Sequence, residues 1–108
     1  MLFRSQSTWN LAFCSVENQS LVAYLKATND LSNIILVIVN LDAHQKQSGY
    51  IQLPLQRLLL NGHMINVKLQ DLITGENYTW TQEWNFVELE PNKMPFHIFK
   101  MEVHASQM

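Results

Sequence analysis

The chain has 108 residues and a mass of 12.6 kDa, which is the size of a single domain. Hydrophobic residues make up 47% and charged residues 15% of the sequence, so there is ample material for a packed core and the composition argues against disorder. Seven basic and nine acidic residues give a net charge of -2 with both signs interspersed, which predicts that nucleic acid is not a partner.

Cysteine usage and hydropathy bear on the cellular compartment. The single cysteine, Cys14, cannot form an internal disulfide and is typical of a reducing environment. The longest aliphatic run, residues 34–39, is far shorter than the roughly 20 residues of a membrane-spanning helix, and residues 1–7 lack the pattern of a secretory leader. We therefore expect a cytoplasmic protein with no membrane partner.

Short apolar or alternating runs, separated by polar turns, predict an all-β domain. In the first half of the chain the predicted strands are 9–14, 21–26, 34–39 and 49–53. Every residue in 34–39 is aliphatic, which predicts a central strand covered on both faces. We expect either Leu36 and Ile38, or Val37 and Val39, to lie at the centre of the core.

The second half begins with the only stretch of helical propensity, residues 55–60, which predicts one short helical turn. Further strands are predicted at 64–69, 78–80, 84–89 and 96–103, with Gly75 in a turn that suits a positive φ. Residues 81–83 are expected to join 78–80 and 84–89 as a hairpin. The pattern as a whole predicts an antiparallel sandwich or barrel of seven or eight strands.

No group of residues has the pattern of a catalytic or metal site. The histidines at positions 44, 63, 97 and 104 lack metal-binding spacing. Asp42 and His44 could form an acid–base pair, but a role in stabilising a turn is favoured because no nucleophile motif accompanies them. Glu88 and Glu90 share one face of a strand and cannot flank a glycosidic bond. We predict no catalytic residue, no metal ligand and no cofactor.

Aromatic residues offer one candidate binding surface. Trp80, Trp84, Tyr78 and Tyr50 lie on predicted strands and could form a stacking platform for sugar rings. Core filling is the favoured alternative, because aromatic side chains are enriched on strands for packing alone. Cys14 lies in an apolar strand and is expected to be a small buried hydrophobe.

Several segments, in this order, carry a resemblance to a known family: 34–42 (IILVIVNLD), 47–55 (QSGYIQLPL), 71–75 (DLITG), 78–80 (YTW), 84–89 (WNFVEL) and 95–99 (PFHIF). They resemble the C-terminal domain of α-amylase-superfamily enzymes. More narrowly, they are similar to the end of the α-1,4-glucan:maltose-1-phosphate maltosyltransferases, cytoplasmic enzymes that extend α-glucans from maltose 1-phosphate. The resemblance covers about residues 9–103, and the family often has proline at the position of Ala43 and histidine at that of Gln70.

The resemblance implies an antiparallel Greek-key β-sandwich over residues 9–104, following a catalytic (β/α)8 barrel in the same parent chain. It places the catalytic carboxylates in that barrel, so none is expected here, and it leaves open whether the parent transfers maltosyl units or acts as a glycosidase. Residues 1–8, with Leu2-Phe3-Arg4, would be a linker or the end of the last barrel helix. Residues 105–108 would be a tail.

Two functions of different kinds follow from these observations. The leading hypothesis is a non-catalytic accessory domain that stabilises the barrel, with a docking edge at Leu2, Phe3 and Trp9. The alternative is a carbohydrate-binding module that holds α-glucan on Trp80, Trp84 or Tyr50. A sugar platform requires coplanar exposed rings, whereas a docking face is a broader apolar patch.

Overall fold

The fold is known from a computed structural model that describes residues 9–58, 60, 65–93 and 95–103. These residues form eight strands and no helix: β1 (Trp9–Cys14), β2 (Leu21–Thr28), β3 (Ile34–Asn40), β4 (Gln47–Gln52), β5 (Val67–Asp71), β6 (Asn77–Trp80), β7 (Trp84–Leu89) and β8 (Phe96–Val103). One sheet has six strands in the order β1-β2-β3-β8-β5-β6, and a second sheet pairs β4 with β7.

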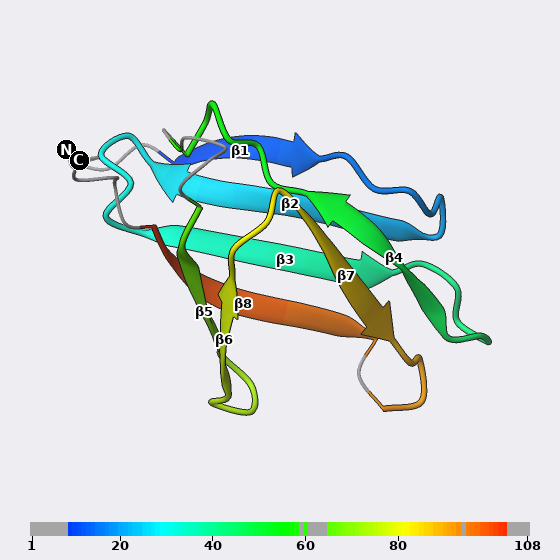
Figure 1. Cartoon of the computed structure of the whole chain (residues 1–108). Helices are drawn as coiled ribbons and strands as arrows, with labels where there is room; N and C mark the ends of the chain where they lie inside the picture. Colours follow the sequence, from blue (N-terminus) through cyan, green and yellow to red (C-terminus); the bar gives the residue numbers. More distant parts are fainter. Residues whose placement is uncertain (1–8, 59, 61–64, 94, 104–108) are drawn as a thin grey trace, which may run out of the picture.

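The two sheets form a sandwich, with β4 and β7 lying across one face of the larger sheet (Figure 1). Every strand pair is antiparallel. Long connections bring β8 back beside β3 and β7 back beside β4, which is the connectivity of Greek-key sandwiches. The predicted antiparallel Greek-key β-sandwich of seven or eight strands is confirmed.

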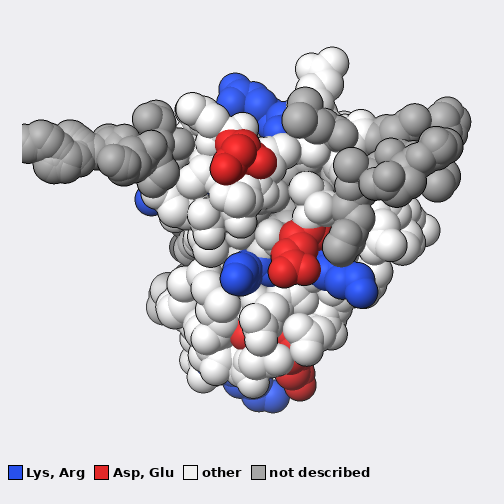
Figure 2. Space-filling view, turned by 90° about the vertical axis from the view of Figure 1, so that its left-hand side faces the viewer, with Lys and Arg blue, Asp and Glu red and all other residues white. Residues whose placement is uncertain are grey.

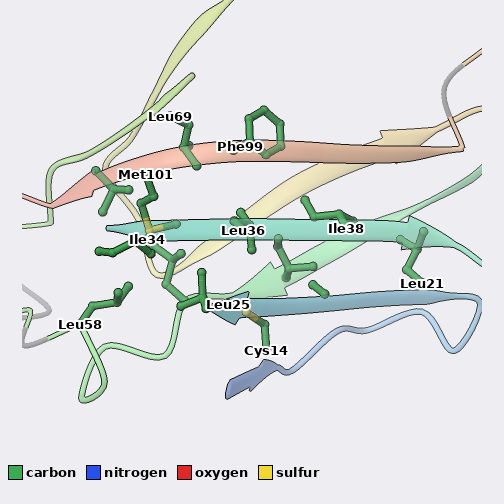
Figure 3. Close-up of a cluster of buried hydrophobic side chains, with 14 of the residues drawn as sticks. Cys14, Leu21, Leu25, Ile34, Leu36, Ile38, Leu58, Leu69, Phe99 and Met101 are labelled. Carbon is green, nitrogen blue, oxygen red and sulfur yellow. The ribbon is translucent and has the colours of Figure 1, made fainter. Parts of the chain in front are cut away.

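The core lies between the sheets because the strands alternate, and the inward positions are aliphatic. On β3 the inward residues Ile34, Leu36 and Ile38 are at most 1% exposed. They pack with Leu25 of β2 and Phe99 of β8 (Figure 3). Burying side chains of this size stabilises the fold by about 1.5–3 kcal/mol each relative to leaving them exposed.

The other face of β3 departs from the sequence prediction. Ile35, Val37 and Val39 are only half-buried, so the prediction that both faces of this strand are covered is wrong for the residues described. The reason is geometric: the second sheet has two strands and lies on one face only. Of the two predicted core pairs, Leu36 and Ile38 are the buried one.

The short helical turn predicted near 55–60 is a single hydrogen-bonded turn over residues 54–58, which does not extend into a helix. The Leu58 N–H donates to the Pro54 carbonyl at 3.1 Å, and residues 55–58 form a turn around this bond. Leu58 is 1% exposed, so the turn anchors the end of the core. Residues 55–58 are too few for the hydrogen bonds of a helix to offset the free-energy cost of nucleating it. Packing of the Leu58 side chain fixes the conformation of the turn instead.

The hairpin predicted between 78–80 and 84–89 is absent, and that prediction was wrong. β6 pairs with β5 and β7 pairs with β4, so residues 81–83 carry the chain from one sheet to the other. The Leu53 N–H donates to the Glu83 carbonyl at 2.8 Å and fixes this crossing. Alternation identifies a strand but not its partner, which is why the pattern alone suggested the nearest neighbour.

Two glycines stand where their lack of a side chain matters. A Cβ on Gly49 would lie 3.2 Å from the Asn18 Cβ, so this position keeps β4 close to the turn before β2. Gly75 has φ 83°, which confirms the positive φ expected for this turn. Near Gly49 the Glu17 N–H donates to the Tyr50 carbonyl at 3.1 Å, so the chain after β1 also pairs with β4.

Candidate functional site

A groove lies between the unpaired edge of β7 and the inward face of β5, β6 and β8. Its volume is about 240 Å³. Eight residues line it: Leu69, Tyr78, Trp80, Phe86, Val87, Glu88, His97 and Phe99. Four of these are Phe, Tyr or Trp, so half of the lining is aromatic, and its titratable groups are the Tyr78 hydroxyl, the His97 imidazole and the Glu88 carboxylate. We call these eight residues the aromatic groove.

The groove exists because the larger sheet extends beyond the smaller one. Tyr78 is in register with Leu69 on the inward face, yet its side chain is 42% exposed because no strand of the second sheet covers it. The Tyr78 ring meets Phe99 edge to face, with centroids 5.9 Å apart. His97 stacks on the same Phe99 ring at 5.3 Å and an interplanar angle of 10°. Packing therefore holds these rings in fixed orientations.

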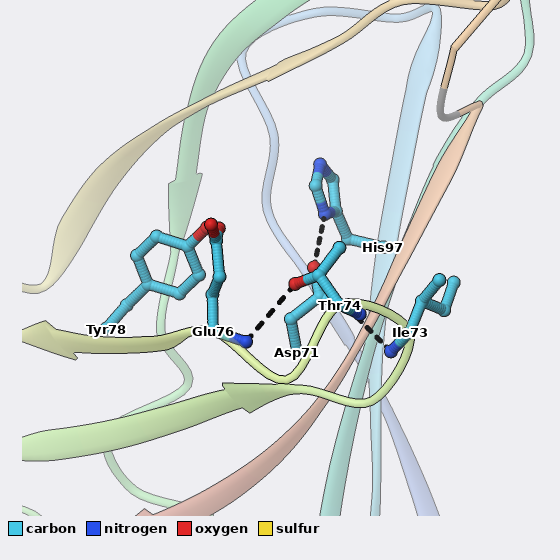
Figure 4. A network of polar contacts seen from close by, with 6 residues as sticks. All are labelled: Asp71, Ile73, Thr74, Glu76, Tyr78 and His97. Atoms are coloured by element: carbon cyan, nitrogen blue, oxygen red, sulfur yellow. Dashed lines mark hydrogen bonds and ion pairs between the residues drawn. The ribbon is translucent and has the colours of Figure 1, made fainter.

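Asp71 organises the turn beneath the groove (Figure 4). Its carboxylate, 2% exposed, accepts hydrogen bonds from the N–H groups of Ile73 at 2.8 Å and Thr74 at 3.1 Å. Burial alone would raise the pKa of Asp71, but these two bonds and the nearby His97 ring outweigh it and lower the pKa below 3.8. The Asp71 carboxylate is therefore ionised and stabilises the turn, and it also lies next to His97 of the groove.

His97 connects this turn to the groove. Its Nδ1 lies 3.5 Å from Asp71 Oδ2, a distance too long for a good hydrogen bond, and this buried atom has no other partner among the described residues. The second ring nitrogen points away from Asp71 (Figure 4). At the other side of the groove the Tyr78 hydroxyl donates to Glu76 at 2.6 Å, and this bond raises the pKa of Tyr78.

Glu88 is the carboxylate of the groove. It forms an ion pair with Lys46 at 3.3 Å, and both side chains are about half exposed. None of the eight lining residues is Lys or Arg. On the side of the molecule seen in Figure 2, acidic and basic side chains are few and interspersed, so no field of one sign surrounds the domain there.

The aromatic residues named from the sequence fall on different surfaces. Trp80 lies in the groove, where it packs against the core. Tyr50 and Trp84 lie on the outer face of the two-stranded sheet, opposite the buried Ile51. Tyr50 meets Phe86 edge to face, at 5.5 Å and 68°, so these neighbouring rings do not form a coplanar platform.

The sequence did not indicate the groove as a unit. Phe86, His97 and Phe99 lie near Trp80 and Tyr78 because residues 81–83 carry the chain from β6 to β7 in the smaller sheet, and because β8 inserts into the larger sheet next to β5. The usable signal is that 96–103 is predicted as a strand, because residues two apart on a strand, such as His97 and Phe99, point to the same side of the sheet.

A second surface of interest is the outer face of the six-stranded sheet. The register aligns Phe13, Tyr24, Val37 and Ile98 in one row. The row on one side consists of Val22, Val39 and Phe96, and the row on the other of Leu11, Lys26, Ile35 and Lys100. Phe13 is 68% and Leu11 53% exposed. We call these eleven residues the outer face; apart from its two lysines, it is apolar or aromatic.

Trp9 borders the outer face at the start of β1. Its side chain is 44% exposed, and the Lys26 Nζ lies 5.9 Å from the ring centroid, close enough for a cation–π contact. Leu2 and Phe3, which the sequence grouped with Trp9 as a docking edge, lie outside the described residues.

Asp42 and His44 form a turn. The Asp42 carboxylate accepts hydrogen bonds from the backbone N–H of His44 at 2.9 Å and from the Gln47 side chain at 2.9 Å. These bonds, the one from His44 first, lower the pKa of Asp42. The contact to His44 thus involves its backbone, in agreement with the turn-stabilising role that the sequence favoured.

Cys14 is buried at 8% exposure, and desolvation raises the pKa of its thiol to about 11. Such a thiol is a core hydrophobe and not a nucleophile. Within residues 9–103, as far as they are described, no three His, Cys, Asp or Glu side chains cluster in a way that could hold a metal ion. No helix in that part of the chain could cross a membrane.

Comparison with known proteins identifies the family. Residues 13–101 match the family described as "GLGE, C-terminal". The alpha-1,4-glucan:maltose-1-phosphate maltosyltransferase of Chlorobaculum tepidum is 36% identical over 91% of this chain and 15% of its own length. The maltosyltransferase 2 of Streptomyces coelicolor is 39% identical over 83% of this chain and 13% of its own length. The chain thus spans about one seventh of these relatives, and it belongs to the GLGE C-terminal domain family.

Proposed function

We propose that this chain is the non-catalytic C-terminal accessory domain of a cytoplasmic α-glucan maltosyltransferase and that it stabilises the catalytic (β/α)8 barrel of the same parent chain. The relatives are named as maltosyltransferases, and the chain corresponds to 13–15% of their length. The remaining length of such a parent is ample for a catalytic barrel, which typically needs about 250 residues. The catalytic carboxylates then belong to the barrel.

The observation that carries the accessory role is the outer face. An antiparallel sheet with one free face normally alternates polar residues outward, but the outward positions of β3 are Ile35, Val37 and Val39. Phe13 and Ile98 extend this apolar surface across the neighbouring strands. Contiguous apolar surface of this kind marks a protein contact, and the N-terminal edge of the face is where a preceding domain would connect.

Cytoplasmic residence is supported by the chemistry of Cys14. The single cysteine of the sequence lies in the core with a raised pKa, so the fold neither contains a disulfide in its described part nor needs one. That is the expected condition for a domain that folds in a reducing compartment.

A domain exchange tests the proposed role. In the Chlorobaculum tepidum relative, the C-terminal segment that matches this chain is replaced by residues 9–103, and thermal unfolding and maltosyl transfer are measured. We expect an active chimera whose melting temperature falls when Phe13→Ser and Val37→Thr are introduced together. Tyr50→Ser, on the other sheet, is the matched control and should leave it unchanged.

If the two outer-face substitutions left the melting temperature of the chimera unchanged, the outer face would not contact the barrel. If they lowered the stability of the isolated chain by the same amount, their effect would be internal to the domain. Unfolding of the isolated variants is therefore measured in parallel.

A further inference from the structure

We propose that the aromatic groove binds one pyranose ring of a neutral α-glucan chain. The identity of the sugar rests on the proposed function, because α-1,4-glucan enters through the names of the relatives. The shape and chemistry of the site rest on the structure alone. The site differs from the platform of Trp80, Trp84 and Tyr50 considered from sequence, since only Trp80 belongs to it.

The size of the groove suits part of a chain and not a whole ligand. Its volume of about 240 Å³ is below the roughly 300–1,000 Å³ of pockets that enclose drug-sized molecules. Tyr78 is 42% exposed, so the groove is open on the side that this residue borders. One ring can enter while the rest of a linear chain remains outside.

The lining has the two components that a pyranose ring requires. The C–H face of a sugar packs on aromatic rings, and Tyr78 and Trp80, which share the inward face of β6, supply such surfaces. The Phe99 ring contacts Tyr78 edge to face and stacks in parallel on His97. These contacts fix the Tyr78 and His97 side chains before any ligand binds. Fixed rings lose little conformational entropy on binding.

The polar groups of the groove can serve the hydroxyls of a sugar. His97 holds one ring nitrogen toward Asp71 and directs the other away from it, and His97 lines the groove. Glu88 offers a carboxylate that can accept hydrogen bonds from hydroxyl groups. The lining contains neither Lys nor Arg, the nearby Lys46 is paired with Glu88, and the Glu88 carboxylate would repel a phosphate. The groove therefore favours a neutral glucan over maltose 1-phosphate.

The groove would remain accessible in the parent protein. On β8, Phe96 and Ile98 point to the outer face, whereas His97 and Phe99 point to the groove. A barrel seated on the outer face therefore contacts the opposite side of the same strand. This arrangement allows the domain to bind a glucan while it is docked.

Titration of the 108-residue chain with maltoheptaose, followed by backbone amide shifts, tests the proposal. We expect saturable shifts with a dissociation constant near 1 mM, centred on Tyr78, Trp80, Phe86 and His97. Three other compounds are titrated in parallel: cellohexaose as a β-linked glucan, maltose 1-phosphate as a charged sugar, and tetramethylammonium as a cation that binds aromatic rings. Saturable shifts at these residues that are stronger with maltoheptaose than with any of the other three support the proposal; an equal or stronger response to any of the other three overturns it.

Two variants keep the test specific. Tyr78→Ala should weaken binding about five- to tenfold, the value of one aromatic contact. Trp9→Ala is its matched control, since Trp9 is 44% exposed but does not line the groove and lies on β1, at the opposite edge of the larger sheet from β6, and it should bind as wild type. His97→Phe keeps the stacking on Phe99 but removes the ring nitrogens, so it should weaken binding while preserving the amide spectrum.

Absence of saturable shifts up to about 10 mM maltoheptaose would overturn the proposal. So would equal weakening by Tyr78→Ala and Trp9→Ala in chains that remain folded. Neither result would show whether the outer face contacts the barrel, so the domain exchange would still test the accessory role independently.

Discussion

Asn40 and Leu89 lie 49 residues apart in the sequence, and the Asn40 side-chain amide donates a hydrogen bond to the Leu89 carbonyl at 3.0 Å. The bond links the end of β3 in the larger sheet to the end of β7 in the smaller one. The same amide donates to the Gln45 carbonyl at 3.1 Å, and its oxygen accepts the Asp42 N–H at 2.8 Å. One buried polar side chain thus joins the two layers of the sandwich.

Asn40→Ala should lower the free energy of unfolding by about 1–3 kcal/mol, because it leaves the buried Leu89 carbonyl without this donor. Urea unfolding followed by tryptophan fluorescence measures the change. Asn33→Ala is the control: Asn33 is exposed and its amide donates only to Ser32 at 3.3 Å, so a change within about 0.5 kcal/mol is expected. Equal effects of the two substitutions would contradict the role assigned to Asn40.

Adjacent positions on β3 should differ sharply. Leu36→Ala removes a side chain that is 0% exposed and should cost about 2–5 kcal/mol, whereas the half-buried Val37→Ala should cost less than about 1.5 kcal/mol. Thermal and urea unfolding of both variants give the comparison. A larger loss from Val37→Ala would mean that the outer face, and not the space between the sheets, holds the core.

Acid should weaken the fold partly through Asp71. The pKa of Asp71 is lower in the folded state than its ordinary value of 3.8. Its carboxylate therefore stabilises the fold at pH values above 3.8, and this contribution is lost as the pH falls through the folded pKa. Urea unfolding at about pH 7, 4 and 3 should therefore show a smaller loss of stability on acidification for Asp71→Asn than for wild type. Identical losses would show that Asp71 does not contribute.

The isolated chain should self-associate weakly at high concentration, because the outer face exposes Phe13 and Leu11 to water. Sedimentation velocity over a concentration series should show this, and Phe13→Ser should reduce it. Tyr50→Ser, which removes an aromatic side chain of the other sheet, should not. If Tyr50→Ser were the variant that reduced association, the contact would involve the smaller sheet.

Local periodicity was sufficient to locate the strands. The predicted ranges 9–14, 84–89 and 96–103 coincide with β1, β7 and β8. Pairing was not predictable in the same way, because β6 and β7 are neighbours in sequence but belong to different sheets. Their partners depend on which strands return from far along the chain, and alternation carries no information about this.

The groove was unpredictable for the same reason. Trp80 and Tyr78 could be named as aromatic candidates, but their association with Phe86, His97 and Phe99 depends on the unequal widths of the two sheets. The outer face could be inferred in part, since six consecutive aliphatic residues require cover on both sides. The sequence could not show that one of those sides remains uncovered within this domain.

The position of β8 has a consequence for how the domain folds. This strand is the last in sequence, but it pairs with both β3 and β5 and so joins the two halves of the larger sheet. The β1-β2-β3 meander can form early through local turns, whereas closing the loop that brings β8 beside β3 requires most of the second half of the chain. The larger sheet therefore stays divided until β8 is available to pair, and until then the edge of β3 that β8 occupies has unpaired backbone N–H and C=O groups.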